Sequence, residues 1–165
     1  MKKWLSVILS IVMLSTVLGS GASFAFAATA ATSGSCGDNI KYNIDTGTGV
    51  LTLTGSGATN NYSNMNVNFG SSIKRCPWYN SRDSIKRVVI SEGVTVLGNY
   101  LFFEMTSVQT VILPSTVTGV NRYAFAGCTA LSTVNLQDTK ITKIGLNALS
   151  LIHISEPTRH SLISY

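Results

Sequence analysis

Apolar residues recur in one pattern at three places along the chain. The three stretches begin at Ile85, Val108 and Leu131, so each begins 23 residues after the one before it. Within each stretch the first, fourth and sixth positions are apolar, and the positions between them are mostly polar. A fixed period of this length indicates a repeat protein, in which each unit covers the hydrophobic edge of its neighbour.

The spacing of the apolar positions also indicates the kind of repeat. L-x-x-L-x-L at a period of roughly 20 to 29 residues is the strand signature of a leucine-rich repeat. We therefore predict a mainly β fold, a leucine-rich-repeat solenoid of short parallel strands with a 23-residue period. Stacking predicts three buried rows, namely Ile85, Val108 and Leu131; Val88, Val111 and Val134; and Ile90, Leu113 and Leu136.

The pattern continues after each strand and divides residues 84–148 into three repeats. Val94 and Leu97 in the first repeat (84–107) correspond to Val117 and Val120 in the second (108–130). In the third (131–148, truncated), the matching Ile141 and Ile144 come 24 residues later. We place the extra residue within 137–140, where a surface loop tolerates it.

The remaining strand positions point outward, because side chains alternate between the two faces of a strand. In a solenoid such positions form an extended surface that can bind a partner. The alternative is a merely solvated or half-covered sheet face, since these residues carry no distinctive chemistry. The candidate binding face comprises Arg87, Val89, Thr110, Ile112, Thr133 and Asn135.

An N-terminal cap over residues 38–83 is predicted before the repeats. Residues 40–44 and 50–54 alternate apolar and polar, and the turn-rich stretch 45–49 joins them. This β-hairpin would cover the open end of the first repeat. We predict a long loop over 55–72, rich in Gly, Asn and Ser, and a flexible lead-in over 28–37.

Several motifs resemble the BspA-like leucine-rich repeats of bacterial surface proteins. Those units read roughly V-x-I-P-x-S-V-T-x-I-G-x-x-A-F-x-G-C, and this chain has Val111-Ile-Leu-Pro-Ser-Thr-Val117 and Tyr123-Ala-Phe-Ala-Gly-Cys128. The first repeat departs from the pattern, with Ser91 where Pro is usual and Leu101-Phe-Phe-Glu-Met105 in place of Ala-Phe-x-Gly-Cys. The resemblance covers about residues 36–148. It implies surface display and adhesion or ligand binding, with no catalytic residues to carry over.

Residues 1–27 have the organisation of a signal peptide. Lys2 and Lys3 precede an apolar stretch over 5–18, and Ala25-Phe-Ala27 fits a small-x-small cleavage site. An uncleaved membrane anchor is the weaker alternative, because it would need about 20 apolar residues. We therefore expect a secreted or cell-surface protein that is not held in the membrane after cleavage.

The last residues, 149–165, resemble the translated adapter of a sequencing library rather than natural protein. The stretch Leu149-Ser-Leu-Ile-His-Ile-Ser-Glu-Pro-Thr-Arg159 carries this resemblance, and the repeat breaks where Leu149 replaces an expected Phe. The alternative is a genuine capping tail. We expect a non-native tail, so that the natural repeats continue beyond Ala148.

Composition argues against chemistry in the remaining region. Both histidines, His153 and His160, lie in the suspect tail. Without a histidine or paired acids, we predict no catalytic residues, no enzyme, no cofactor and no metal.

Residues 28–148 carry a net charge of +3, compared with +5 for the whole chain, and have no dense basic stripe, so we expect no nucleic-acid partner. One basic cluster, at residues 74–75, 82 and 86–87, fits either an anionic wall polymer or glycan, or a solvated cap surface.

The cysteines leave one alternative open. Cys36 and Cys76 both belong to the cap region and would form a disulfide if their Cα atoms lay within roughly 7 Å. Otherwise they are free thiols. Cys128 occupies a repeat position and is expected to be a small buried residue.

Together these observations predict a secreted or surface-displayed, non-catalytic module that binds a protein or glycan through its strand face. The competing hypothesis is an accessory module at the N-terminus of a larger secreted cell-wall or glycan hydrolase.

Sequencing the source locus across the Ala148 codon tests the expected non-native tail. We expect the frame to continue as Ala-Phe and further units of about 23 residues. A natural stop codon directly after Tyr165 would contradict this expectation.

Overall fold

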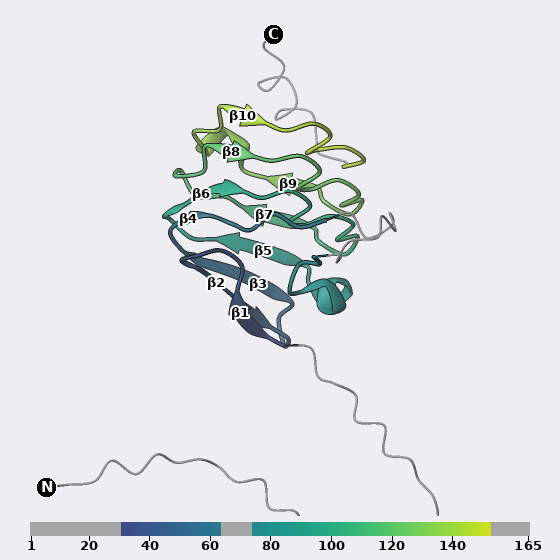
Figure 1. Cartoon of the computed structure of the whole chain (residues 1–165). Coiled ribbons are helices and arrows are strands. Elements are labelled where there is room, and N and C mark those ends of the chain that lie inside the picture. Colours follow the sequence, from purple (N-terminus) through teal and green to yellow (C-terminus); the bar gives the residue numbers. More distant parts are fainter. Residues whose placement is uncertain (1–30, 64–73, 153–165) are drawn as a thin grey trace, which may run out of the picture.

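The computed structural model describes residues 31–63 and 74–152, and these residues form a stack of coils (Figure 1). The predicted signal peptide, most of the predicted loop 55–72 and residues 153–165 of the predicted tail lie outside the described residues. The strands are β1 Ser33–Ser35, β2 Ile40–Asp45, β3 Val50–Gly55, β4 Gly57–Ala58, β5 Arg87–Ile90, β6 Val94–Leu97, β7 Thr110–Ile112, β8 Gly119–Val120, β9 Thr133–Val134 and β10 Lys143–Ile144. Two short 3₁₀ helices, η1 Tyr79–Ser84 and η2 Leu136–Asp138, complete the elements.

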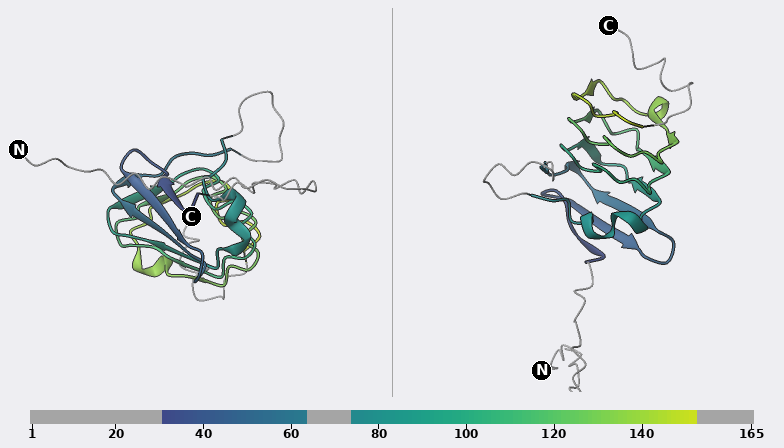
Figure 2. Two further views of the ribbon diagram at one scale, coloured as in Figure 1. Left: turned by 90° about the horizontal axis from the view of Figure 1, so that it is seen from below. Right: turned by 90° about the vertical axis from the view of Figure 1, so that its right-hand side faces the viewer.

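Each repeat contributes one strand to each of two sheets. The larger sheet has six strands in the order β1-β2-β3-β5-β7-β9, and the smaller has four in the order β10-β8-β6-β4. The repeat strands pair in parallel in both sheets. Seen along the stacking direction, the coils lie over one another as one outline (Figure 2). The predicted mainly β solenoid of short parallel strands is confirmed.

The predicted rows of apolar side chains fill the interior of the coils. All nine residues of the three rows are buried. The rows also extend into the cap, because β3 pairs in parallel with β5 and places Leu51 beside Val88 and Leu53 beside Ile90. Leu51 and Leu53 are fully buried. The hydrophobic core is therefore continuous from the cap to the third repeat.

The cap is built like a diverged repeat. Its strand β3 takes the place of a repeat strand in the large sheet, and β4 pairs in parallel with β6 in the small sheet. The Tyr62 N–H then donates to the Asn99 carbonyl at 2.9 Å, which continues the stacking at the next corner. Directly after this corner the Ser63 N–H donates to the Lys74 carbonyl at 3.0 Å, which holds the two described segments together there.

A stack of aromatic rings runs through the core from the cap into the repeats. The Trp78 ring stacks on Phe102 with centroids 5.7 Å apart, and Phe102 stacks on Phe125 at 5.1 Å. Tyr42 of β2 makes an edge contact with Trp78, with the ring centroids 5.4 Å apart. Trp78, Phe102 and Phe125 are almost completely buried. This aromatic ladder joins the hairpin, the segment before η1 and the first two repeats.

Two positions in each corner turn adopt the left-handed backbone conformation. The first is occupied by Tyr100, Tyr123 and Asn147, and the second by Glu104, Gly127 and Leu151. Glycine reaches this conformation without strain, and asparagine tolerates it better than most residues. The turn of the third repeat thus follows the same path as the first two.

Three predicted boundaries are wrong. The lead-in 28–37 was expected to be flexible, yet β1 pairs with β2 and Cys36 is buried, because the hairpin edge offers unpaired hydrogen-bonding groups. The predicted loop 55–72 includes Gly55, which ends β3, and residues 57–58, which form β4. The repeat was expected to break at Leu149, but its backbone continues, since the Gly127 N–H donates to the Ser150 carbonyl at 3.1 Å and Leu149 packs against the core.

The extra residue of the third repeat is absorbed at a corner. Strand β10 pairs with β8 through Lys143 beside Gly119 and Ile144 beside Val120, which is the predicted 24-residue offset. The short helix η2 occupies the corner between β9 and β10 and overlaps the stretch 137–140 predicted for the insertion. The repeat strands β6, β8 and β10 of the small sheet therefore keep a continuous register.

Truncating the middle ring of the aromatic ladder tests its importance. We expect Phe102→Ala to lower the free energy of unfolding by about 3–5 kcal/mol, because it removes a buried ring between two stacked partners. Phe103→Ala is the matched control, since Phe103 is the half-buried next residue, and it should cost much less. Urea denaturation measures both, and equal losses would contradict the role given to the ladder.

Candidate binding face

The predicted outward residues lie together on the outer side of the large sheet. Arg87, Thr110 and Thr133 are direct register neighbours on β5, β7 and β9. Val89 and Ile112 are paired in the same way two residues further along. Arg87 and Thr133 are exposed, whereas the other three are half-buried. We call the outer side of the six-stranded sheet the strand face.

The strand face continues onto the cap, which the sequence reasoning missed. Val50 of β3 lies beside Arg87, and Thr52 lies beside Val89. Strand β2 adds Asp45 beside Val50 and Asn43 beside Thr52. The alternation in residues 40–54 indicates which of these residues face outward, but the sequence does not show that β3 pairs with β5. The result is one continuous surface with an apolar centre and a polar surround.

Asn135 has a structural role rather than a free position on this face. Its Oδ1 accepts a hydrogen bond from the Leu113 N–H at 2.7 Å, and its Nδ2 donates to the Leu113 carbonyl at 2.9 Å. Strand β9 ends at Val134, so the side-chain amide pairs with the backbone where the strand no longer does. The structure therefore assigns the Asn135 amide to hydrogen bonds within the fold, and its predicted part in ligand binding stays a prediction.

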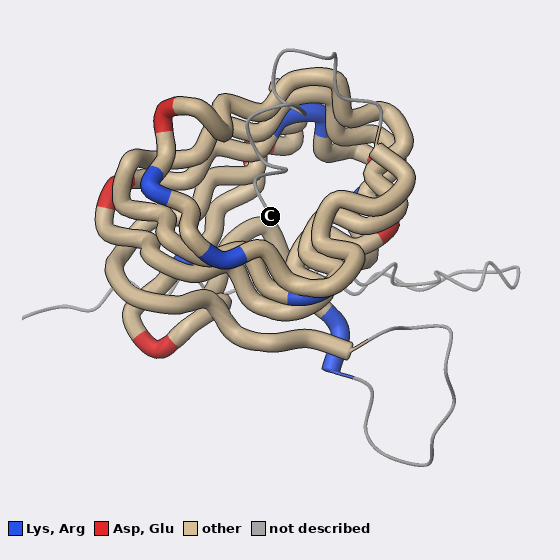
Figure 3. Tube along the Cα trace, turned by 90° about the horizontal axis from the view of Figure 1, so that it is seen from above, with Lys and Arg blue, Asp and Glu red and all other residues tan. Residues whose placement is uncertain are grey.

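The small sheet presents a plainer surface. Thr118 and Thr142 each bond to the carbonyl of the equivalent threonine in the preceding repeat, Thr95 and Thr118, through both the backbone N–H and the hydroxyl. These hydroxyl groups are therefore already used between coils. The charged residues lie at scattered places around the outside of the coils rather than in one stripe (Figure 3).

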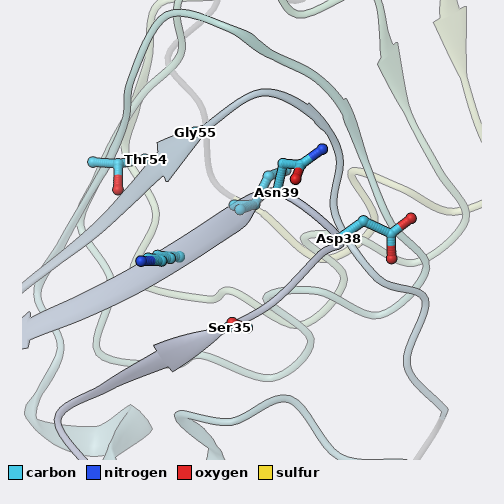
Figure 4. Close-up of a pocket in the computed structure, with 7 residues that line it drawn as sticks. Ser35, Asp38, Asn39, Thr54 and Gly55 are labelled. Atoms are coloured by element: carbon cyan, nitrogen blue, oxygen red, sulfur yellow. The ribbon is translucent and has the colours of Figure 1, made fainter.

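A shallow pocket of about 300 Å³ lies at the end of the cap hairpin. It is lined by Ser35, Asp38, Asn39, Ile40, Lys41, Thr54 and Gly55. The Asp38 carboxylate and the Thr54 hydroxyl point in different directions instead of converging (Figure 4). The pocket thus lacks the convergent polar groups of a small-molecule site.

Residues 31–63 and 74–152 hold neither a cluster of metal ligands nor a helix that could span a membrane. No three His, Cys, Asp or Glu side chains in these ranges lie close enough together to hold a metal ion. None of the helices in the same ranges has the length and apolar character needed to cross a bilayer.

The cysteines are buried free thiols. The disulfide left open for Cys36 and Cys76 is not formed, and Cys128 is also free. Burial raises the pKa of each thiol to about 12, because the interior solvates a thiolate poorly. Cys128 occupies a repeat position as predicted, and its Sγ lies 3.0 Å from the Phe102 carbonyl.

Replacing Asn135 tests whether its side chain stabilises the fold. We expect Asn135→Ala to lower the free energy of unfolding by about 1–3 kcal/mol, because it leaves the partly buried Leu113 N–H and carbonyl without their partners. Thr133→Ala, at an exposed position on the same strand, should change stability by less than about 0.5 kcal/mol. Thermal unfolding followed by circular dichroism compares the two, and an unaffected Asn135→Ala would return this residue to the ligand-facing set.

The thiol pKa values predict how stability depends on pH. Between about pH 9 and 12 the thiols ionise in the unfolded chain but stay protonated in the folded one. The unfolded state therefore binds fewer protons, and the free energy of unfolding falls as pH rises through this range. Urea titrations at pH 8 and 10 measure the fall, and a Cys128→Ala variant should show a smaller one. A fall of equal size in both proteins would contradict the assignment for Cys128.

Comparison with known proteins agrees with the geometry. Residues 71–164 match the family described as BspA type leucine rich repeat region (6 copies). None of the curated proteins compared with the chain matches it. Three solved leucine-rich repeat proteins resemble the structure. One from Eubacterium ventriosum has a TM-score of 0.61 at 26% identity, over 75% of this chain and 31% of its own.

The other two are a leucine-rich repeat protein from Bacteroides ovatus and a leucine-rich cell surface protein from Faecalibacterium prausnitzii. Their TM-scores are 0.44 and 0.28 at 18% and 17% identity; each match covers 71% of this chain, and 33% and 53% of the respective relative. This chain therefore spans only part of the length of these proteins. Because the family match covers more than half of its length, the chain belongs to the BspA-type leucine-rich-repeat family.

Proposed function

We propose that the protein is an extracellular binding module that holds a protein or glycan partner on its strand face. The observation that carries the proposal is the register of β2, β3, β5, β7 and β9, which aligns outward side chains into one surface across cap and repeats. Solenoids of stacked repeats use extended surfaces of this kind for binding.

The composition of the strand face supports recognition of a macromolecule. Half-buried Val50, Val89 and Ile112 give it an apolar centre, and exposed Arg87 lies beside Val50 in the register. Interfaces commonly combine an apolar centre with a polar rim, and arginine is enriched in them. Because the side chains stand on paired strands, little order has to be gained on binding.

We further propose that the module is secreted or displayed at the cell surface and has no catalytic activity of its own. The organisation of residues 1–27 supports export. Membership of the BspA-type family supports display at the surface, as the resemblance of the repeats implies. The alternative, an accessory module of a larger secreted hydrolase, concerns sequence outside these repeats and makes use of the same face.

A charge placed in the apolar centre of the strand face tests the proposal. The full chain is screened on a glycan array and on a panel of immobilised extracellular matrix proteins. We expect Ile112→Glu to weaken any binding found by about tenfold or more, because a carboxylate would be desolvated in the interface.

Thr118→Glu is the matched control, because it introduces the same side chain on the same repeat but next to the small sheet. It should bind as the unchanged chain does. A ligand whose binding survives Ile112→Glu and is lost in Thr118→Glu would contradict the strand face as the site. Circular dichroism confirms that both variants are folded.

A further inference from the structure

A second surface, separate from the strand face, carries the most concentrated positive charge described for the cap. The guanidinium of Arg75 lies 4.7 Å from the centre of the Tyr79 ring, and that of Arg82 lies 4.1 Å from it. Lys74, directly before Arg75, lies 5.8 Å from the ring of Tyr62. We call Arg75, Tyr79 and Arg82 the arginine–tyrosine cluster.

The cluster is held in place before any ligand arrives. Tyr79 is partly buried and packs against the hydrophobic core, and its N–H donates to the Cys76 carbonyl at 3.1 Å. One guanidinium nitrogen of Arg82 also donates to the Tyr79 carbonyl at 2.9 Å. Two long side chains are thus ordered by the ring and the backbone, which lowers the entropic cost of binding through them.

The charges of the cluster are poorly compensated within the chain. Sharing one ring keeps the two guanidinium carbons less than 9 Å apart, so they repel each other. The carboxylate of Asp83 lies 3.8 Å from Arg82 Nε, but its side chain is 76% exposed, and such an ion pair contributes little. An oxyanion bound to either guanidinium group would offset this repulsion, because each group presents a planar set of donors that matches a carboxylate.

We propose that the arginine–tyrosine cluster binds the carboxylate groups of an acidic polysaccharide. The small number of cations argues against nucleic acid, which is usually bound along a longer basic stripe. Here the cations are few and are grouped on one short segment, residues 74–82. The carboxylates of an acidic polysaccharide offer such a group planar acceptors for charge-assisted contacts. The strand face remains free for another partner.

Titration with polygalacturonate tests the proposal on the full chain. Fluorescently labelled polygalacturonate is the probe, and neutral dextran and a single-stranded oligonucleotide are the comparisons. We expect saturable binding of polygalacturonate at low salt that weakens as sodium chloride rises, because the contacts are charged. Absence of binding, equal binding of dextran, or tighter binding of the oligonucleotide through the same arginines would overturn the proposal.

Variants locate the binding site. Arg75→Gln combined with Arg82→Gln should weaken binding by about tenfold or more, since two charge-assisted contacts are lost. The control, Lys140→Gln combined with Lys143→Gln, removes the same charge from exposed positions in the third repeat and should keep most of the affinity. Equal weakening of polygalacturonate binding in the two double variants would show that binding depends only on the net charge of the chain, and it would overturn the proposal.

Folding of the cap is monitored separately. Trp78 precedes Tyr79 and is buried, so near-ultraviolet circular dichroism reports on the packing beside the cluster. Arg75→Gln alone leaves the Arg82 bond to the Tyr79 carbonyl in place and keeps the test decisive if the double variant unfolds. Unchanged affinity in this single variant would overturn the proposal.

Discussion

The packing of equivalent side chains between successive coils is the interaction on which the rest of the structure depends. No single coil has enough interior to bury its own apolar residues, and each presents them to the next. The rows that contain Val88 and Ile90, together with the aromatic ladder, make this contact continuous from cap to third repeat. The repeat strands of both sheets keep their register because these rows align the coils, whereas the pairing of β4 with β6 in the cap is irregular.

The aromatic ladder also joins the cap to the repeats through one continuous set of ring contacts. Trp78 lies outside the regular repeats, yet its ring occupies the position below Phe102 that another phenylalanine would fill. Its edge contact with Tyr42 ties the hairpin to the same stack. Consequently the strand face can extend over cap and repeats without a flexible joint between them.

The sequence predicted the parts of the fold that repeat and missed those that occur once. The 23-residue period identified the buried rows and the outward residues because the same requirement acts on every coil. Strand β4 was missed because two residues with small side chains carry no periodic signal. The role of Asn135 was missed because alternation gives the direction of a side chain but not the hydrogen bonds that it makes. Pairing of β3 with β5 could not be predicted, since a parallel contact between distant segments leaves no local pattern.

The corners of the coils show where such a chain tolerates change. The extra residue near η2 leaves the pairing of β8 with β10 in register, and the chain segments joined by the hydrogen bond between Ser63 and Lys74 leave the pairing of β3 with β5 in register. Length is thus decoupled from alignment: the strands define a fixed frame, whereas the corners can accept new segments. The junction between Ser63 and Lys74 is accordingly a natural attachment point for an engineered epitope or a grafted recognition loop, which would be presented at one end of an otherwise unaltered scaffold.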